Sequence, residues 1–83
     1  MDNTYLKGLI EEILYVWGDP IDIDDLSKII SDANKNQIKQ TLLEMIDQRN
    51  KKDSGLIIKN FNESYQFTTR AKHDKYFKSL VKS

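Results

Sequence analysis

The period of the hydrophobic pattern changes at Gly55, and this change constrains the fold more than any other feature of the sequence. Before Gly55, apolar residues recur every three to four positions, as on one face of an α-helix. After it, Leu56–Phe61 is rich in β-forming residues, and Tyr65–Arg70 alternates apolar with polar side chains. The short link at residues 62–64 suits a hairpin. A two-stranded ribbon is marginally stable alone, so this hairpin should lie on the helices.

The first helix is predicted to begin near Asn3 or Thr4, either of which can cap free backbone N–H groups. It should end at Gly18, which suits the left-handed position after a last turn, and Pro20 prevents the helix from resuming. Its predicted core stripe consists of Leu6, Ile10, Ile13, Leu14 and Trp17.

Two further helices are predicted before the hairpin. Asp22 can cap a short helix that runs to about Ile30, and Asn34 can cap a long helix over residues 35–52. The residues expected to face inward are Leu26, Ile29 and Ile30 from the short helix, and Ile38, Leu42, Met45 and Ile46 from the long one.

A last helix over residues 71–81 is expected to turn Tyr76, Phe77 and Leu80 toward the body. Three helices followed by a β-hairpin is the order of the α+β winged-helix fold, with the second and third helices as its helix-turn-helix. A short strand near residues 21–23 would add a third strand. The length of 83 residues suits one domain over residues 1–83.

The first helix carries more apolar surface than one small core needs. Tyr5, Leu9 and Val16 form a second apolar strip beside the core stripe. A contiguous apolar strip on a small domain often marks an interface, although the hairpin or the last helix could also cover it. The strip is therefore the candidate interface, with dimerisation through it as the hypothesis.

Charge is distributed unevenly along a chain whose net charge is zero. Residues 1–34 hold eight acids and two lysines, a net charge of −6, whereas residues 35–83 have a net charge of +6. Such asymmetry can indicate nucleic-acid binding, but complementarity within the chain or between subunits is the interpretation favoured here. The C-terminal cations either form a basic patch or are simply solvated.

No residue pattern argues for an enzyme, a cofactor or a metal site. The chain has no cysteine, and its one histidine, His73, lies in a lysine-rich segment without a nucleophile beside it. The Asp22, Asp24 and Asp25 cluster lacks the spacing of a calcium loop, so capping is its expected role. We also expect no membrane-spanning segment and no signal peptide, which favours a cytoplasmic protein.

DNA binding is the alternative function, because helix-turn-helix units often bind DNA. The long helix would then place Lys35, Gln37, Lys39 and Gln40 near bases and phosphates. Glu44 and Asp47 on the same helix would oppose phosphates, and the expected hairpin tip carries Glu63 and no cation. Direct DNA binding is thus the less favoured hypothesis.

The sequence resembles the N-terminal part of the bacterial segregation and condensation protein B family. The matching segments are Leu6–Glu11, Ile13–Val16, Gly18–Ile21 with Leu26, and, in the second half, Gly55–Leu56, Ile58 and Tyr65–Arg70. Trp17 stands where the family usually has a small residue, and the turn at residues 62–64 lacks the usual glycine.

The resemblance implies one of two tandem winged-helix domains in a non-enzymatic accessory subunit. Such subunits dimerise and bind the kleisin, segregation and condensation protein A. Together they join the structural-maintenance-of-chromosomes (SMC) ATPase in chromosome condensation and segregation, in the cytoplasm at the nucleoid. The resemblance places the kleisin contact mainly in the second domain and leaves homodimerisation to this one.

Overall fold

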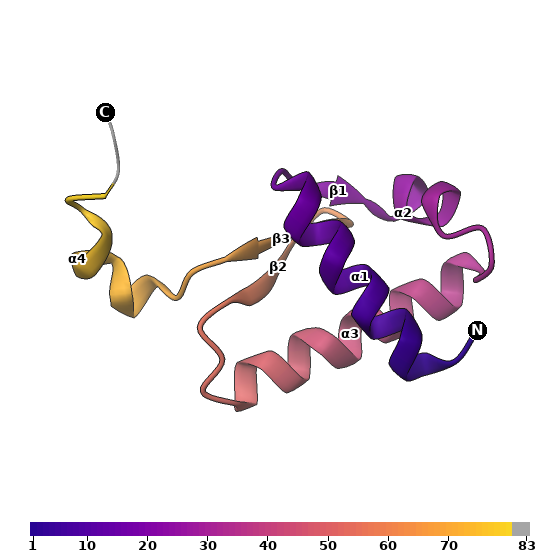
Figure 1. Cartoon of the computed structure of the whole chain (residues 1–83), viewed down its shortest axis with the longest axis horizontal. Helices are drawn as coiled ribbons and strands as arrows, with labels where there is room; N and C mark the ends of the chain where they lie inside the picture. Colours follow the sequence, from indigo (N-terminus) through magenta and orange to yellow (C-terminus); the bar gives the residue numbers. More distant parts are fainter. Residues whose placement is uncertain (81–83) are drawn as a thin grey trace.

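Figure 1 shows the computed structural model of the chain, in which residues 1–80 are described. Three helices surround the core, a small sheet closes one side of it, and a short helical segment stands apart at the C-terminal end. The elements are α1 (Asn3–Trp17), β1 (Ile21–Asp22), α2 (Ile23–Ile29), α3 (Lys35–Lys51), β2 (Ile57–Phe61), β3 (Ser64–Thr68), the 3₁₀ turn η1 (Ala71–His73) and α4 (Asp74–Phe77). This order confirms the predicted winged-helix fold.

Helix α1 is capped one residue earlier than predicted. The Asp2 carboxylate accepts a hydrogen bond from the Tyr5 backbone N–H at 3.1 Å. The side chain of Asn3 is engaged elsewhere, because it bonds to α3. At the other end, Gly18 adopts φ 79°, and its N–H donates to the Leu14 carbonyl, as the glycine predicted.

The other two predicted caps are confirmed. The Asp22 side chain accepts from the Asp25 N–H at 2.8 Å, and the Asn34 side chain accepts from the Gln37 N–H at 2.8 Å. Each cap satisfies a backbone donor that would otherwise lack an intrahelical partner. The Asp22 cap thereby fixes the start of α2, and the Asn34 cap fixes the end of the turn that leads into α3.

The core lies where α1, α2, α3 and the sheet meet. Its buried residues are Leu6, Ile10, Leu14, Ile21, Ile23, Leu26, Ile30, Ala33, Ile38, Leu42, Met45, Ile58 and Tyr65. A partly buried polar contact joins two helices, since the hydroxyl of the buried Thr41 donates to Asn3 Oδ1 at 3.0 Å. The predicted stripe of α3 is confirmed, with Ile46 only partly buried.

The sheet has the strand order β1-β3-β2, with both pairings antiparallel, so β3 is the central strand. Asn62 and Glu63 form the tip of the hairpin with φ values of 50° and 66°. Positive φ at both central residues is the mark of a type I′ turn, which matches the twist of the strands. The Glu63 carbonyl also accepts from the Ile23 N–H at 3.1 Å, which ties the tip to α2.

The predicted last helix is wrong in length and in position. Only η1 and α4 are helical there, and Figure 1 shows them beyond the end of the sheet, away from the helical body. Tyr76 is 66% exposed and Leu80 is 75% exposed, whereas both were expected to face the body. A helix this short has little stability of its own without tertiary packing. Val81, its predicted end, lies outside the described residues.

Candidate functional site

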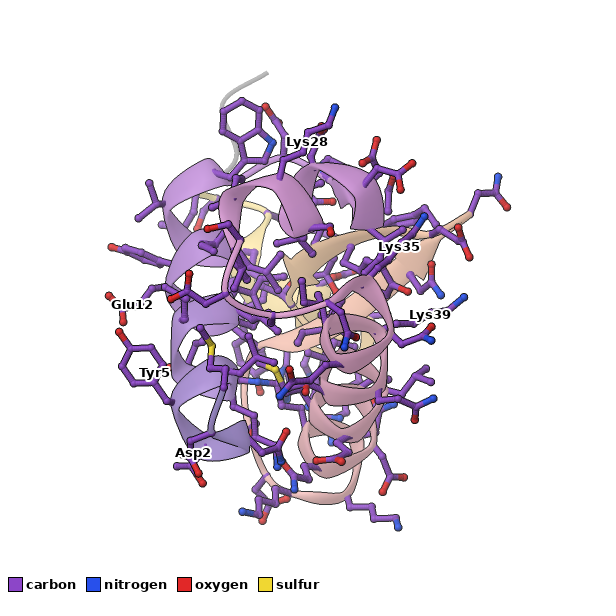
Figure 2. All side chains as sticks on the ribbon, turned by 90° about the vertical axis from the view of Figure 1, so that its right-hand side faces the viewer. Asp2, Tyr5, Glu12, Lys28, Lys35 and Lys39 are labelled. Carbon is purple, nitrogen blue, oxygen red and sulfur yellow. The ribbon has the colours of Figure 1, made fainter. Side chains whose placement is uncertain are left out.

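The surplus apolar strip of α1 lies on the surface. Tyr5 is 65% exposed and Val16 is 80% exposed, while Leu9 is partly buried against the core. In Figure 2, Tyr5 projects from α1 on the side away from α3, with Glu12 above it on the same edge. Neither the hairpin nor α4 covers this strip, so the internal alternative does not apply to the described residues.

Two further apolar side chains extend this surface at the C-terminal end of α1. Trp17 is 58% exposed and Ile29 of α2 is 57% exposed. With Ile13, Val16 and Ile21 they line a shallow apolar hollow of about 280 Å³ between the two helices. The name "α1 face" is used below for the surface formed by Tyr5, Leu9, Ile13, Val16, Trp17 and Ile29.

The predictions that Trp17 and Ile29 face the core are therefore wrong. A helical wheel gives the direction of a side chain but not how far the core extends along the axis. Trp17 is the last residue of α1 and lies beyond Leu14, the last buried residue of this helix. Ile29 points about 90° away from the mean direction of the buried α2 residues at 100° per residue, a signal already present in the sequence.

The candidate DNA-contacting lysines of α3 are engaged in ion pairs. Lys35 pairs with Asp24 of α2, and Lys39 pairs with Glu63 of the hairpin tip at 2.8 Å. Hydrogen bonding to the acid raises the pKa of each lysine and lowers the pKa of each acid. Both lysines lie on the same side of the molecule in Figure 2. Their charges are therefore matched by acids of the chain itself.

The two candidate glutamines differ from one another. Gln37 is partly buried, and its side-chain Nε2 donates to the Met1 carbonyl at 2.7 Å. Gln40 is exposed on the next turn. The structure thus places all four candidates along the first turns of α3, but it holds three of them in contacts within the chain.

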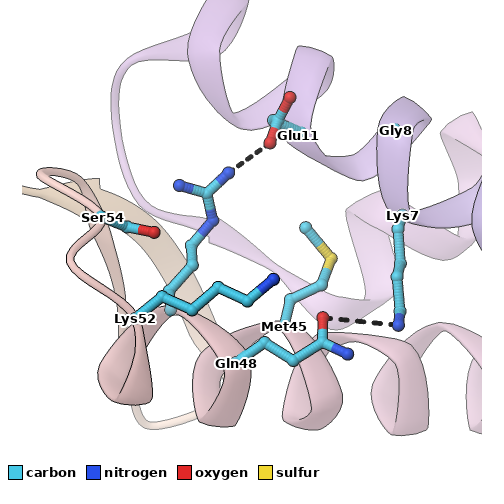
Figure 3. A pocket seen from close by; sticks show the side chains of 8 residues that line it. Lys7, Gly8, Glu11, Met45, Gln48, Lys52 and Ser54 are labelled. Carbon is cyan, nitrogen blue, oxygen red and sulfur yellow. Dashed lines mark hydrogen bonds and ion pairs between the residues drawn. The ribbon is translucent and has the colours of Figure 1, made fainter.

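A second groove runs between α1 and the C-terminal half of α3, and Figure 3 shows its lining. Arg49 of α3 pairs with Glu11 of α1 across the groove, and its guanidinium carbon lies 4.9 Å from the centre of the Phe67 ring. Lys7 pairs with Glu44 at 3.2 Å and donates to Gln48 at 3.4 Å. These polar links bridge the groove between the two helices. In this respect the groove differs from the α1 face, which is open.

Arg70 has a structural role that the sequence did not reveal. Its guanidinium donates to the carbonyls of Ser54 at 2.7 Å, Arg49 at 2.7 Å and Lys52 at 2.9 Å. Two of these carbonyls belong to the last turn and C-cap of α3, where acceptors lack intrahelical partners. Arg70 therefore joins the end of the sheet to the end of α3 and is not one of the freely solvated cations.

Side chains that could bind a metal ion are dispersed over residues 1–80, the part of the chain that the structure describes. No group of three metal-ligating side chains occurs in this part of the chain. His73 lies 6.4 Å from Tyr76, ring centre to ring centre, in an edge-to-face arrangement. None of the described helices has the length and apolar character needed to cross a membrane.

Comparison with known proteins gives evidence on the family of this chain that is independent of the site geometry. Residues 8–83 match the family described as Segregation and condensation complex subunit ScpB. The chain belongs to this family. The segregation and condensation protein B of Alkaliphilus oremlandii is 39% identical over 96% of this chain and 43% of its own length. That of Alkaliphilus metalliredigens is also 39% identical, over 96% of this chain and 42% of its own. The chain thus spans less than half the length of these relatives.

Two solved ScpB structures share the fold. The crystal structure of ScpB from Mycobacterium tuberculosis superposes on 96% of this chain and 49% of its own, with a TM-score of 0.87 and 26% identity. A crystal structure of a dimer of the ScpB N-terminal domain complexed with a ScpA peptide superposes on 90% of this chain and 93% of its own. Its TM-score is 0.80 at 18% identity. The winged-helix assignment therefore stands on both sequence and structure.

Proposed function

We propose that this chain is a dimerising, non-enzymatic winged-helix domain of an accessory subunit of the bacterial SMC–kleisin complex, which condenses and segregates chromosomes. The observation that carries the proposal is the open α1 face, where Tyr5, Val16 and Trp17 are each more than half exposed. Contiguous apolar surface of this kind is costly in water and is characteristic of protein interfaces. Membership of the ScpB family supports the same conclusion.

Residues 1–83 form one winged-helix domain in this proposal, equivalent to the N-terminal domain of a two-domain protein. Support comes from the two Alkaliphilus relatives, because the chain covers only 43% of the length of one and 42% of the other. The match to an isolated ScpB N-terminal domain, 93% of which is covered, agrees with this view.

The partners in this proposal are a second copy of the chain, the kleisin ScpA and, through the full-length protein, the SMC ATPase. A related N-terminal domain dimer was crystallised with a ScpA peptide, which supports both of the direct contacts. We therefore extend the kleisin contact to this domain and do not reserve it for a second one. The complex would act in the cytoplasm at the nucleoid.

DNA binding is the weaker alternative. Affinity for DNA depends on cations that are free to contact phosphates, and Asp24 and Glu63 occupy the two lysines best placed on α3. The hairpin tip carries Glu63, which would face the phosphates. These contacts favour a protein partner for the domain.

Sedimentation at micromolar concentrations tests the proposal. The wild-type chain should sediment as a dimer, and Val16→Glu should weaken dimerisation at least tenfold, or about 1.4 kcal/mol, because it places a charge in an apolar interface. Val16 is a better site than Leu9, because Leu9→Glu would also disturb the core that Leu9 partly contacts.

Leu43→Glu is the matched control, since Leu43 is an exposed leucine on α3, outside the α1 face. It should leave the dimer unchanged. A wild-type chain that remains monomeric at all concentrations, or a dimer equally weakened by both substitutions, would refute the proposed interface.

A further inference from the structure

The C-terminal arm, residues 71–80, is the part of the described chain that the proposed function leaves without a role. It consists of η1, α4 and the residues that follow, and α4 contacts mainly η1. Figure 1 shows it projecting beyond the sheet. The superposition on the M. tuberculosis structure leaves out only 4% of this chain, so the superposed part must include most of this arm of ten residues.

The arm combines apolar and basic side chains. Tyr76 and Leu80 are exposed, and Lys72, Lys75 and Lys78 outnumber the single acid Asp74. The Lys75 ammonium lies 5.2 Å from the centre of the Tyr76 ring, so charge and aromatic surface occur together on α4. Such a segment fits a surface that is apolar with an acidic border.

The α1 face is a surface of that kind. Glu12 borders the hollow formed by Val16, Trp17 and Ile29, and Asp25 borders its continuation along α2. Within the described residues, neither of these acids forms an ion pair with a Lys or Arg side chain. Lys28 is the one cation among the residues that line this border. The face thus carries net negative charge and the arm net positive charge.

In Figure 1 the arm runs beyond the end of the sheet, away from α2. Arg70 fixes the root of the arm to the C-terminal end of α3 through three hydrogen bonds. The α2 side of the face lies near the N-terminal end of α3, where Asp24 pairs with Lys35. These ends are separated by the 17 residues of α3, or about 25 Å at 1.5 Å per residue.

We propose that the arm of one copy packs on the α1 face of a second copy, and that the second arm packs reciprocally on the first. This inference rests on the proposed dimerisation and identifies what covers the exposed face. A two-fold axis makes each contact occur twice, as in any isologous dimer. Tyr76 and Leu80 then bury apolar surface against Val16, Trp17 and Ile29, while the arm lysines meet Glu12 and Asp25.

The dimensions of the two surfaces agree. Ten residues in helical or near-helical form span about 15–20 Å, and the face runs about 18 Å along α1 from Tyr5 to Trp17. One arm is therefore long enough to cover most of one face. In such a dimer each copy contributes one arm and receives one, so the α1 faces of both copies are covered.

A charge-exchange experiment tests the proposal on the full chain. The arm variant carries Lys75→Glu and Lys78→Glu, and the face variant carries Glu12→Lys and Asp25→Lys. Each variant alone sets like charges against one another at both contacts and should dimerise about tenfold or more weakly than wild type. An equimolar mixture of the two should recover the wild-type dissociation constant, because in the mixed dimer both contacts pair opposite charges.

Recovery on mixing is the decisive result, since an arm that folds back on its own face would give no recovery. Normal dimerisation of the arm variant, or loss of dimer that mixing does not restore, would overturn the arm exchange. The matched control is Lys52→Glu with Lys59→Glu, which makes the same change in net charge at exposed lysines outside the arm and should not weaken the dimer.

The same experiment separates this inference from the proposed function. A wild-type chain that never dimerises overturns both proposals. A wild-type dimer that Val16→Glu dissociates, but that the arm variant leaves intact, overturns only the arm exchange. Thermal unfolding of each variant establishes that it is folded before its sedimentation is interpreted.

Discussion

The two long helices differ in the contacts that their outward-facing side chains make. The polar face of α3 is largely matched within the chain, because Lys35, Lys39 and Glu44 each pair with a side chain of another element. The face of α1 remains apolar and open. In this winged helix, the surface without partners inside the chain therefore lies on α1, and not on the helix that a helix-turn-helix unit presents to DNA.

The largest effect should separate the two sides of α1. Leu14→Ala removes a buried side chain and should lower the free energy of unfolding by about 2–5 kcal/mol. Val16→Ala, two residues away but exposed, should change it by no more than about 0.5 kcal/mol. Urea denaturation at low protein concentration, where association does not contribute, measures both. Equal losses would mean that the α1 face is covered within the monomer.

The next effect concerns the end of α3. Arg70→Met leaves three carbonyls without their donor and should cost about 1–3 kcal/mol of unfolding free energy. Lys78→Met, at an exposed cation of the arm, is the control and should be nearly neutral in the same urea titration. If both substitutions were neutral, the bonds of Arg70 would not stabilise the domain, and the contrast between a matched α3 and an open α1 would weaken.

DNA binding tests the matched charges of α3 directly. Wild type should bind a random duplex no tighter than about 1 μM, the strong end of non-specific binding. Asp24→Asn with Glu63→Gln frees Lys35 and Lys39, so it should bind about tenfold tighter at low salt, with a salt slope steeper by about 2. Fluorescence anisotropy across a salt series measures this. Nanomolar wild-type binding, lost on neutralising the two lysines, would reverse the functional ranking.

The smallest effect is the response of the ion pairs to acid. Lys39 lowers the pKa of Glu63 in the folded chain below its ordinary 4.5, so the pair stabilises the fold above that value and is lost as the pH falls through the lower folded pKa. Glu63→Gln should therefore make the stability depend less steeply on pH below about pH 4.5, and it should lower the stability only slightly at pH 7. Thermal melting from pH 3 to 7 follows the difference, and an unchanged acid limb would contradict the pairing.

The sequence was sufficient for the fold because its local signals agree with one another. Asp22, Asn34 and Gly18 each perform the capping role that their chemistry predicts. The alternating segment that begins at Tyr65 likewise predicted a strand, which the structure has as β3 (Ser64–Thr68). These features depend on neighbours in the sequence, so one chain can reveal them.

The site was only partly predictable, because exposure depends on where the core ends. The wheel identified Tyr5 and Val16 correctly as surplus surface but assigned Trp17 to the core, since periodicity says nothing about the length of the layer that covers a helix. The ion pairs of Lys35 and Lys39 and the bonds of Arg70 join residues far apart in the sequence. No local pattern encodes such contacts, and their sequence separation hides them until the chain is folded.

The position of Arg70 also determines how the domain carries a mechanical load. The arm leaves the body from β3, the central strand, which is bonded to a neighbour on each side. A pull on the arm therefore shears both strand pairings at once instead of opening one of them bond by bond. At the same point the Arg70 guanidinium passes part of the tension to the end of α3. A subunit that holds its assembly together through this arm would thus transmit force into its core by two parallel routes.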